Sequence, residues 1–449
     1  MQAFFTPRSV AVIGASREPS KLGNIIFSNF VASGFKKLYP INPNADEILG
    51  IKCYKSILEV KERVDLAIIV VPAKIVPQVL EECVKKKVPS TVIISSGFSE
   101  TGEEGAKLEQ QLRQIIAKGN TRVIGPNCIG IYDAYSQVDT LFLSRERCGR
   151  PKKGNISFIS QSGAVGSTIL DMLYSKGIGI SKFISYGNGM DVNETDLIEF
   201  LAKDKTTRVI IAYLEGLKSD GRKFLQAAKK VKKPIIVLKA GKSEKGCKAA
   251  SSHTGSLAGS SRIYSAAFKQ FGMIEVENWE ELLDYALAFS TQPLPKGNRV
   301  VIITDGGGFG VLAADEAERL DLTIPEPSQN LKKKLLASMP SYVSLQNPID
   351  LSGDADAERY DLALRECLAS KEYDAAILIT LFQVPTLDDR VIDYVIRAKK
   401  FNKPIIVCSV GSSFSEERNK KLMEAGIPVY PTPERAVKAL NALIRFSKK

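Results

Sequence analysis

The chain has 449 residues, of which 44% are hydrophobic and 25% are charged, as expected of a globular protein with about two to four domains. Its longest apolar runs fall far short of the ~18 residues that cross a bilayer, and its N-terminus lacks the basic flank of a signal peptide, so we expect a cytoplasmic protein with no membrane partner. The formal charge of +12 comes without a nucleic-acid-binding motif, which disfavours nucleic acid and suits anionic small ligands.

The first 133 residues alternate short β-branched apolar runs with amphipathic stretches, the pattern of parallel βα units. The sequence therefore predicts a Rossmann-like domain over residues 1–133. Its expected strands are 10–13, 38–41, 65–71, 91–95 and 122–124, and helices such as 74–87 and 102–118 fall between them.

The turn after the first of these strands is a candidate phosphate-binding turn, because it leads from a strand into a helix. It contains Gly14, Ser16, Arg17 and Lys21 but no G-x-G-x-x-G fingerprint, and Asn42 rather than an acidic residue follows the second strand. Both departures argue against NAD and an NAD-linked dehydrogenase. The two cations suit a ligand with more phosphate charge, such as the ADP-3′-phosphate end of coenzyme A.

A polar linker, 134–153, leads to two further α/β domains, which we expect at 154–292 and 298–449. They have the character of an internal repeat, because 154–163 parallels 297–306 and 233–237 parallels 403–407. The chain between Gly241 and Gly272 is about twice as long as its counterpart between Gly411 and Gly426. The second domain therefore carries an insertion that its scaffold does not need.

This insertion contains His253, the only histidine of the chain, among small residues that predict a loop. A neutral imidazole can attack phosphorus when one ring nitrogen is free and an acceptor holds the other. Glu215, which ends the strand 209–214, is a candidate acceptor, although an acid at this position can equally cap a helix. Ser162 and Gly163 begin a helix after another strand, where free amides and the helix dipole favour a phosphate.

The seven cysteines form no C-x-x-C pair, which with a single histidine argues against both a disulfide framework and a zinc site. We expect no metal ligands in this chain.

Together these motifs resemble the α subunit of succinyl-CoA synthetase and, more closely, the ADP-forming acetyl-CoA synthetases. The third domain, with Asn347-Pro-Ile-Asp350, is similar to the extra flavodoxin-like ligase-CoA domain of the acetyl-type enzymes, which favours that group. The resemblance implies a Rossmann-like CoA-binding domain followed by two flavodoxin-like domains. It rests on Gly14-Ala-Ser16, Val71-Pro72, Ser95-Ser-Gly97, Gly125-Pro-Asn-Cys128, Ser160-Gln-Ser-Gly163, Leu214-Glu-Gly216 and Ser252-His-Thr-Gly-Ser256.

The resemblance also implies roles for the matching residues. Ser162 and Gly163 would hold phosphate, Glu215 would orient His253, and His253 would carry the phosphoryl group. Asn127 and Cys128 would lie near the pantetheine thiol. The CoA site would be lined by Gly14, Ser16, Arg17, Val71, Pro72, Ser95, Ser96, Asn127 and Cys128.

The implied reaction is acyl-CoA + ADP + phosphate ⇌ carboxylic acid + CoA + ATP, through an acyl phosphate and a phosphohistidine. Family members bind ADP or ATP with Mg²⁺ in an ATP-grasp module, whose pattern this chain lacks, so the resemblance implies a separate β subunit, in an α2β2 heterotetramer. The sequence leaves open the acid (acetate, branched-chain or aryl), the choice of ADP or GDP, and a relay histidine in the partner. The alternative is a non-catalytic, CoA-binding regulatory subunit.

Overall fold

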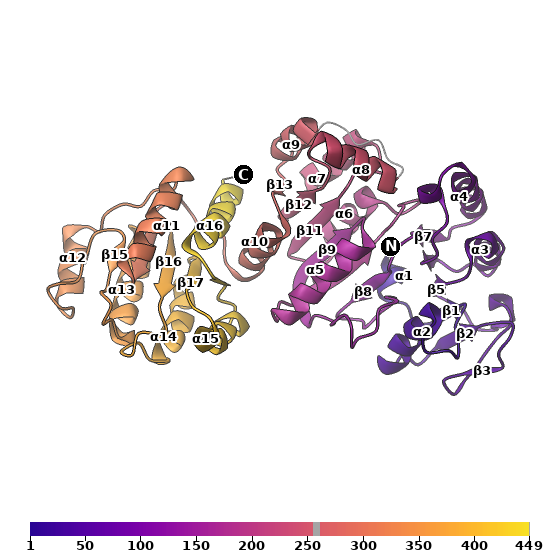
Figure 1. Cartoon of the computed structure of the whole chain (residues 1–449), viewed down its shortest axis with the longest axis horizontal. Coiled ribbons are helices and arrows are strands. Elements are labelled where there is room, and N and C mark those ends of the chain that lie inside the picture. Colours follow the sequence, from indigo (N-terminus) through magenta and orange to yellow (C-terminus); the bar gives the residue numbers. More distant parts are fainter. Residues whose placement is uncertain (255–260, 449) are drawn as a thin grey trace. The chain divides into compact units, whose positions relative to one another are not determined.

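The computed structural model describes residues 1–254 and 261–448, and of residues 250–254 it describes the backbone alone. The chain divides into two compact units, Met1–Trp279 and Glu280–Lys449 (Figure 1). Two large sheets lie in the first unit and one in the second. All three are wholly or mainly parallel, which confirms the α/β class.

The first sheet has five parallel strands in the order β2-β1-β5-β6-β7. All five predicted strand runs are confirmed, with ends that differ by a few residues. The strand order reverses direction between β1 and β5. The elements are β1 (Val10–Ile13), β2 (Leu38–Ile41), β5 (Leu66–Ile69), β6 (Ser90–Ile93) and β7 (Arg122–Ile124), the hairpin β3 (Glu47–Ile48) and β4 (Ile51–Lys52), the helices α1 (Gln2–Phe5), α2 (Leu22–Ala32), α3 (Val76–Lys85) and α4 (Glu103–Ile116), and the short 3₁₀ turns η1 (Ile57–Glu59), η2 (Ala73–Ile75) and η3 (Ser99–Thr101).

The second sheet has the order β13-β12-β11-β9-β10-β8, in which only β8 runs antiparallel. Its parallel strands follow the flavodoxin-like order, with the reversal between β9 and β11. Its elements are β8 (Ile131–Asp133), β9 (Lys153–Ser160), β10 (Ile180–Ser185), β11 (Val209–Leu214), β12 (Ile235–Lys239), β13 (Ile274–Val276), α5 (Gly163–Ser175), α6 (Glu194–Lys203), α7 (Gly221–Lys230), α8 (Glu244–Thr254) and α9 (Ser261–Gln270).

The two sheets of the first unit share one hydrophobic core. Val92 and Ile124 of the first sheet belong to the same buried cluster as Ile159 and Ile210 of the second. This shared burial explains why both sheets form a single compact unit, since apolar burial is the main stabilising term of a fold.

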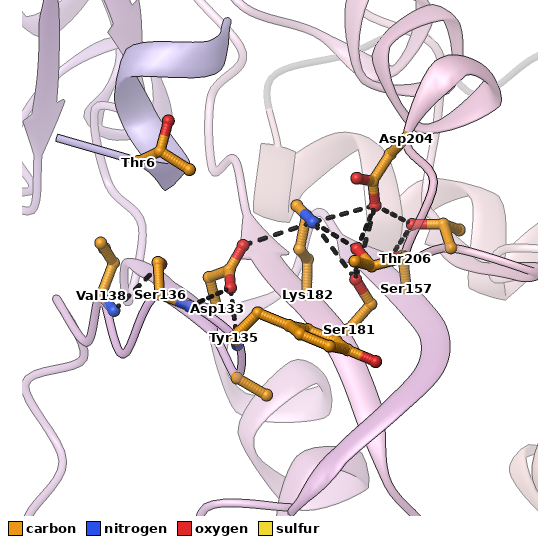
Figure 2. Close-up of polar contacts among 12 residues, drawn as sticks. Thr6, Asp133, Tyr135, Ser136, Val138, Ser157, Ser181, Lys182, Asp204 and Thr206 are labelled. Carbon is orange, nitrogen blue, oxygen red and sulfur yellow. Dashed lines mark hydrogen bonds and ion pairs between the residues drawn. The ribbon is translucent and has the colours of Figure 1, made fainter.

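A buried lysine joins β8 to the rest of the second sheet (Figure 2). Lys182, on β10, has its ammonium group 3.3 Å from Asp133 of β8 and 2.9 Å from Asp204, which follows α6. It also donates to the hydroxyls of Ser181 and Thr206 at 3.2 and 3.0 Å. The β8 segment was expected to end the first domain, but this ion pair and the pairing with β10 place it in the second sheet.

The second unit holds the third sheet, with five parallel strands in the order β15-β14-β16-β17-β18. This is again the flavodoxin-like order, so the predicted repeat is present in the topology. Its elements are β14 (Val300–Thr304), β15 (Ile349–Asp350), β16 (Ala375–Thr380), β17 (Ile405–Ser409), β18 (Val429–Tyr430), α10 (Trp279–Thr291), α11 (Gly307–Arg319), α12 (Gln329–Leu336), α13 (Ala357–Ala369), α14 (Arg390–Ala398), η4 (Lys399–Phe401), α15 (Ser413–Glu424) and α16 (Pro433–Ser447).

The helix α10 was expected in the second domain, but nearly all of it belongs to the second unit. Asp284 on α10 accepts two hydrogen bonds from Arg435 of α16, at 2.7 and 2.8 Å, and Phe289 packs edge-on against Phe446. Within the described part of the chain, no helix is both long enough and apolar enough to span a membrane.

Candidate active site

A cleft of about 730 Å³ lies at the carboxyl ends of the strands of the first sheet. Its walls come from residues that follow β1, β5, β6 and β7 and from the turn between β9 and α5. The strand order reverses at β1/β5 and at β9/β11, and α/β sheets bind ligands at such points. The volume suits a small-molecule ligand. The predicted site residues that line the cleft are Gly14, Ser16, Val71, Pro72, Ser95, Ser96, Asn127, Cys128, Ser162 and Gly163.

The turn after β1 lies directly on the end of β5. Gly14 has φ +91°, and a Cβ atom at this position would stand 2.2 Å from the carbonyl oxygen of Val70, so the turn requires glycine. Ser16 is held by its carbonyl oxygen, which accepts a hydrogen bond from Asn24 at 2.8 Å. Its hydroxyl oxygen accepts the N–H of Glu18 at 3.1 Å. The turn therefore presents a fixed backbone to the cleft.

The two cations of this turn differ in position. Lys21 lines the cleft, whereas Arg17 is not among the lining residues and donates to the carbonyl of Asn44 at 3.5 Å. Asn42 at the end of β2 also lines the cleft, and its amide donates to the carbonyl of Ala15 at 2.7 Å. The structure thus favours Lys21 over Arg17 as the cation nearest a bound ligand.

Ser95 links the walls that follow β5 and β6, because its hydroxyl donates to the carbonyl of Val71 at 2.5 Å. The loop after Ser96 is held by Glu100, which accepts the N–H groups of Gly97 and Phe98 at 2.6 and 3.1 Å. Burial alone would raise the pKa of Glu100, but these bonds and one from a neighbouring asparagine hold it below its ordinary value. The carboxylate is therefore ionised at neutral pH.

Asn127 and Cys128 form the far wall of the cleft. Asn127 has a left-handed backbone, with φ 57°, and its N–H donates to the carbonyl of Ser95 at 2.9 Å. The thiol of Cys128 donates to the carbonyl of Ile93 at 3.3 Å, and burial raises the pKa of Cys128 to about 12. A thiol with this pKa stays protonated at neutral pH, which disfavours a nucleophilic role for Cys128.

The turn between β9 and α5 brings a helix N-terminus to the cleft. Ser162 is the N-cap of α5, and its hydroxyl accepts the N–H of Val165 at 3.4 Å. A Cβ atom on Gly163 would come within 2.5 Å of the side chain of Ile129, so a larger residue would displace the opposite wall. The first amides of a helix lack intrahelical partners and favour an anion. Ser162 and Gly163 can therefore hold a phosphate inside the cleft.

Glu215 does not line the cleft; it lies at the end of β11 and is buried, with 5% of its surface exposed. Its backbone is held by two side chains, Gln161 and Lys239. Burial raises the pKa of the Tyr213 hydroxyl, and the charge of Glu215 and a hydrogen bond with it raise this pKa further. The carboxylate thus lies within reach of Tyr213 at the carboxyl edge of the second sheet.

The side chain of His253 lies outside the described residues, and only its backbone is placed. The prediction of a loop around it is wrong for the described part, because residues 244–254 form α8. The hydroxyl of Ser243 accepts the N–H of Gly246 at 3.0 Å and so caps this helix. Lys245, Lys248 and Ala249 have high helix propensity, which outweighs the small residues after them. The helix contacts η3, which follows the cleft residues Ser95 and Ser96 along the chain.

Sequence reasoning assigned no separate role to Gln161. Gln161 is among the residues that line the cleft, and its side-chain amide contacts the turn after β11. Only the register of β9 against β11, which brings Ser160 beside Tyr213, shows that it reaches Glu215. Among the described residues, no group of three His, Cys, Asp and Glu side chains could hold a metal ion.

Three family models match the chain in succession. A CoA binding domain matches residues 8–134, a succinyl-CoA ligase like flavodoxin domain matches 153–289, and a ligase-CoA domain matches 300–449.

The chain is 45% identical to the protein named acetate–CoA ligase [ADP-forming] I subunit alpha of Pyrococcus furiosus, over 100% of this chain and 98% of that protein. It is 42% identical to acetate–CoA ligase [ADP-forming] I of Archaeoglobus fulgidus, over 100% of this chain but 64% of that protein. A solved structure of dinucleotide forming acetyl-coenzyme A synthetase 1 from Ca. Korarchaeum cryptofilum, in complex with phosphate and ADP, matches with TM-score 0.94 and 38% identity, over 100% of this chain and 97% of that chain. The chain therefore belongs to the family of ADP-forming acetate–CoA ligases and corresponds to their alpha subunit.

Proposed function

We propose that this chain is the catalytic alpha subunit of an ADP-forming acyl-CoA ligase, with acetate or a similar small carboxylic acid as substrate. The observation that carries the proposal is the single cleft that joins the predicted CoA-binding residues to the phosphate turn at Ser162 and Gly163. A thioester and a phosphate held in one cleft are positioned to react.

The proposed reaction has three steps. A phosphate oxygen attacks the thioester carbonyl, the C–S bond breaks, and the CoA thiolate leaves and takes up a proton. The imidazole of His253 then attacks phosphorus, and the carboxylate leaves as the bond between phosphorus and the acyl oxygen breaks. Finally the phosphoryl group passes from His253 to a terminal oxygen of ADP. In this scheme the amides at the start of α5 stabilise the phosphate charge, and Glu215 orients the imidazole.

CoA would be held along the cleft by the turn after β1 and by Val71, Pro72, Ser95 and Ser96, with its thiol end toward Asn127 and Cys128. The lining supports this fit, because it combines a tight glycine turn, a lysine and serine hydroxyls for the charged end with apolar residues for the pantetheine. When bound, acyl-CoA supplies the thioester, with the acyl carbonyl as the group that phosphate attacks and the CoA thiolate as the leaving group.

We further propose that ADP and Mg²⁺ bind to an ATP-grasp β subunit, in an α2β2 assembly. The relative from A. fulgidus named without a subunit extends well beyond the part that this chain matches, which supports a second polypeptide for the remainder. In this proposal residues 1–130 bind CoA, 131–279 carry the phosphohistidine and 280–449 form the ligase-CoA unit, with β8 and α10 assigned as the structure has them. Seven free cysteines support a reducing, cytoplasmic location.

The test is to incubate the full chain with acetyl-CoA and [³²P]phosphate and to search for protein-bound phosphate that is stable to base and labile to acid. We expect the label on His253, and none in His253→Ala, which should still bind CoA. Label on another residue, or none on the wild type, would contradict the carrier role. CoA binding without any label would favour the regulatory-subunit alternative instead.

A further inference from the structure

We propose that Gln161 is a positioning residue for phosphoryl transfer, because its side-chain amide fixes the backbone of Glu215 and Gly216 beside the phosphate turn. This inference rests on the proposed function, in which Glu215 orients His253. Nothing in the motif itself distinguishes Gln161 from a residue that only packs.

The amide of Gln161 makes three hydrogen bonds to the turn after β11. Its Oε1 accepts the N–H of Glu215 at 2.5 Å and the N–H of Gly216 at 3.1 Å. Its Nε2 donates to the carbonyl oxygen of Gly216 at 2.7 Å. Gln161 is 6% exposed and Glu215 5%, so water has little access to replace these bonds.

Lys239 holds the same turn from the other side. Its ammonium group donates to the carbonyl oxygen of Glu215 at 2.8 Å and lies 4.7 Å from the ring centre of Tyr264. Lys239 is 1% exposed, and burial lowers its pKa. Both backbone polar groups of Glu215 are thus bound by buried side chains, so the turn fixes the point from which its side chain extends.

The third sheet has the same order of parallel strands as the second, so a contact present in both sheets is a requirement of the fold itself. In both sheets a hydroxyl donates to the carbonyl two residues later, from Ser160 at 2.7 Å and from Thr304 at 3.0 Å. This equivalence aligns Gln161 with Asp305 and Gly163 with Gly307, one residue away from the alignment that the sequence predicted. Asp305 likewise accepts the N–H of the residue after the neighbouring strand, Leu381, at 3.1 Å.

An acceptor side chain at this position is therefore a feature of the fold. In the second sheet Gln161 makes two further hydrogen bonds, because it also accepts the N–H of Gly216 and donates to the carbonyl oxygen of Gly216. The residue that follows the neighbouring strand is Glu215 in the second sheet, where the third sheet has Leu381. Gln161 also lines the cleft beside Ser162. It thereby connects the phosphate turn to Glu215 through a single side chain.

The experiment is a double-mutant cycle on the full chain, read as the single-turnover rate of histidine phosphorylation from acetyl-CoA and [³²P]phosphate. Gln161→Met keeps the length of the side chain and removes all three hydrogen bonds. We expect it to slow labelling about 10- to 100-fold, with a much smaller change in the Kd of CoA. In the Glu215→Gln background the same substitution should have little further effect, because Gln161 acts through Glu215.

Additive losses in the cycle, or an unchanged rate in Gln161→Met alongside a slow Glu215→Gln, would overturn this inference and leave the proposed function intact. A wild type without label, or a Glu215→Gln variant with the wild-type rate, would overturn the proposed role of Glu215 and this inference with it. Should Gln161→Met not fold, Gln161→Leu, which also removes all three hydrogen bonds without adding a charge beside Glu215, carries the same cycle.

Gln292 provides a matched control in the second unit. It is 3% exposed, its Oε1 accepts the N–H of Ile405 at 2.9 Å, and its Nε2 donates to the carbonyl oxygen of Gly426 at 2.9 Å. Gln292→Met removes the same kind of bridge, and we expect it to lower the melting temperature while the labelling rate stays within twofold. An equal loss of rate in Gln292→Met would show that general destabilisation, and not the position of Glu215, explains the effect of Gln161→Met.

Discussion

The carboxylate of Asp305 accepts the backbone N–H of Leu381 with both oxygens, at 3.1 and 3.2 Å, while only 2% of the residue is exposed. Burial, together with the nearby charge of Asp350, raises the pKa of Asp305 to about 6, although hydrogen bonds from Leu381 and Tyr360 act in the opposite direction. The folded state therefore disfavours the ionised form of this carboxyl group.

The raised pKa of Asp305 predicts a pH-dependent stability. The pKa of Asp305 in the folded state lies above its ordinary value of 3.8. The contribution of Asp305 to the stability of the fold is therefore fully present below about pH 4 and is lost as the pH rises through about 6. Asp305→Asn keeps an acceptor for Leu381 without the charge. A shift of about two pKa units corresponds to about 3 kcal/mol. We therefore expect Asp305→Asn to stabilise the second unit by up to this amount at pH 7.5 and by little at pH 4. Hydrogen exchange of the Leu381 amide in urea measures this; a difference independent of pH would contradict it.

The buried ion pairs of Lys182 predict a large loss of stability when the cation is removed. Lys182→Met leaves the carboxylates of Asp133 and Asp204 buried without their counter-ion, which should cost about 3–5 kcal/mol at pH 7. Hydrogen bonds from Thr207, Lys182 and Thr206 outweigh burial and lower the pKa of Asp204, so the stability they contribute is lost as the pH falls. The loss in the variant should therefore shrink in acid.

Urea unfolding of the full chain at pH 7 and in acid measures the effect of Lys182→Met. Lys421→Met provides the control, since Lys421 pairs with Glu417 and Asp389 at the exposed surface and its removal should change the free energy of unfolding by far less than that of Lys182. Equal small losses in both variants would show that the Lys182 network contributes no more than a surface pair.

The position of Lys21 in the cleft predicts that it, rather than Arg17, supports the charged end of CoA. Lys21→Ala should weaken CoA binding roughly two- to fivefold, with a loss that shrinks at high salt because the side chain is exposed. Calorimetry with CoA and dephospho-CoA separates contact with the 3′-phosphate, which only CoA carries, from contact with the pyrophosphate. A larger loss in Arg17→Ala than in Lys21→Ala would reverse this assignment.

The raised pKa of Cys128 predicts an unreactive thiol. Iodoacetamide at pH 8 should modify the half-exposed Cys247 well before Cys128, because a thiol with a pKa of about 12 holds almost no thiolate at that pH. Peptide mapping by mass spectrometry measures both sites. Cys128→Ala should bind CoA several-fold more weakly through lost contact but should still accept phosphate on His253. Loss of labelling with normal CoA binding would give Cys128 a chemical role.

The sequence was sufficient for the five strands of the first sheet, because buried parallel strands consist of short apolar runs rich in β-branched residues. Ile131–Asp133 was not recognised as a strand of the second sheet, since three residues carry little pattern and the pairing depends on β10 and Lys182. The helical conformation of 244–254 was missed because its small residues favour a loop while the capping by Ser243 favours a helix.

The candidate site was predictable where residues follow strands directly. Gly14, Val71, Ser95 and Cys128 meet in one cleft because the carboxyl ends of parallel strands share an edge. The difference between Arg17 and Lys21 depends on where each long side chain runs, which sequence does not determine. The proposed role of Gln161 depends on strand register and on the exact alignment of the two repeated domains, both of which required the structure.

The role proposed for Glu215, as the acceptor that orients His253, predicts that its charge matters for phosphoryl transfer. Glu215→Gln keeps the backbone bonds to Gln161 and Lys239 and replaces a carboxylate by a neutral amide. Loss of a charged hydrogen bond to the imidazole should cost roughly 1.5–3 kcal/mol, or about 10- to 150-fold in the rate of histidine phosphorylation. Calorimetry should give the wild-type Kd for CoA, since Glu215 does not line the cleft. Glu215→Asp keeps the charge on a shorter side chain, and its rate of histidine phosphorylation should lie between those of the wild type and Glu215→Gln. Wild-type single-turnover rates in Glu215→Gln would show that the carboxylate stabilises the turn and has no part in orienting His253.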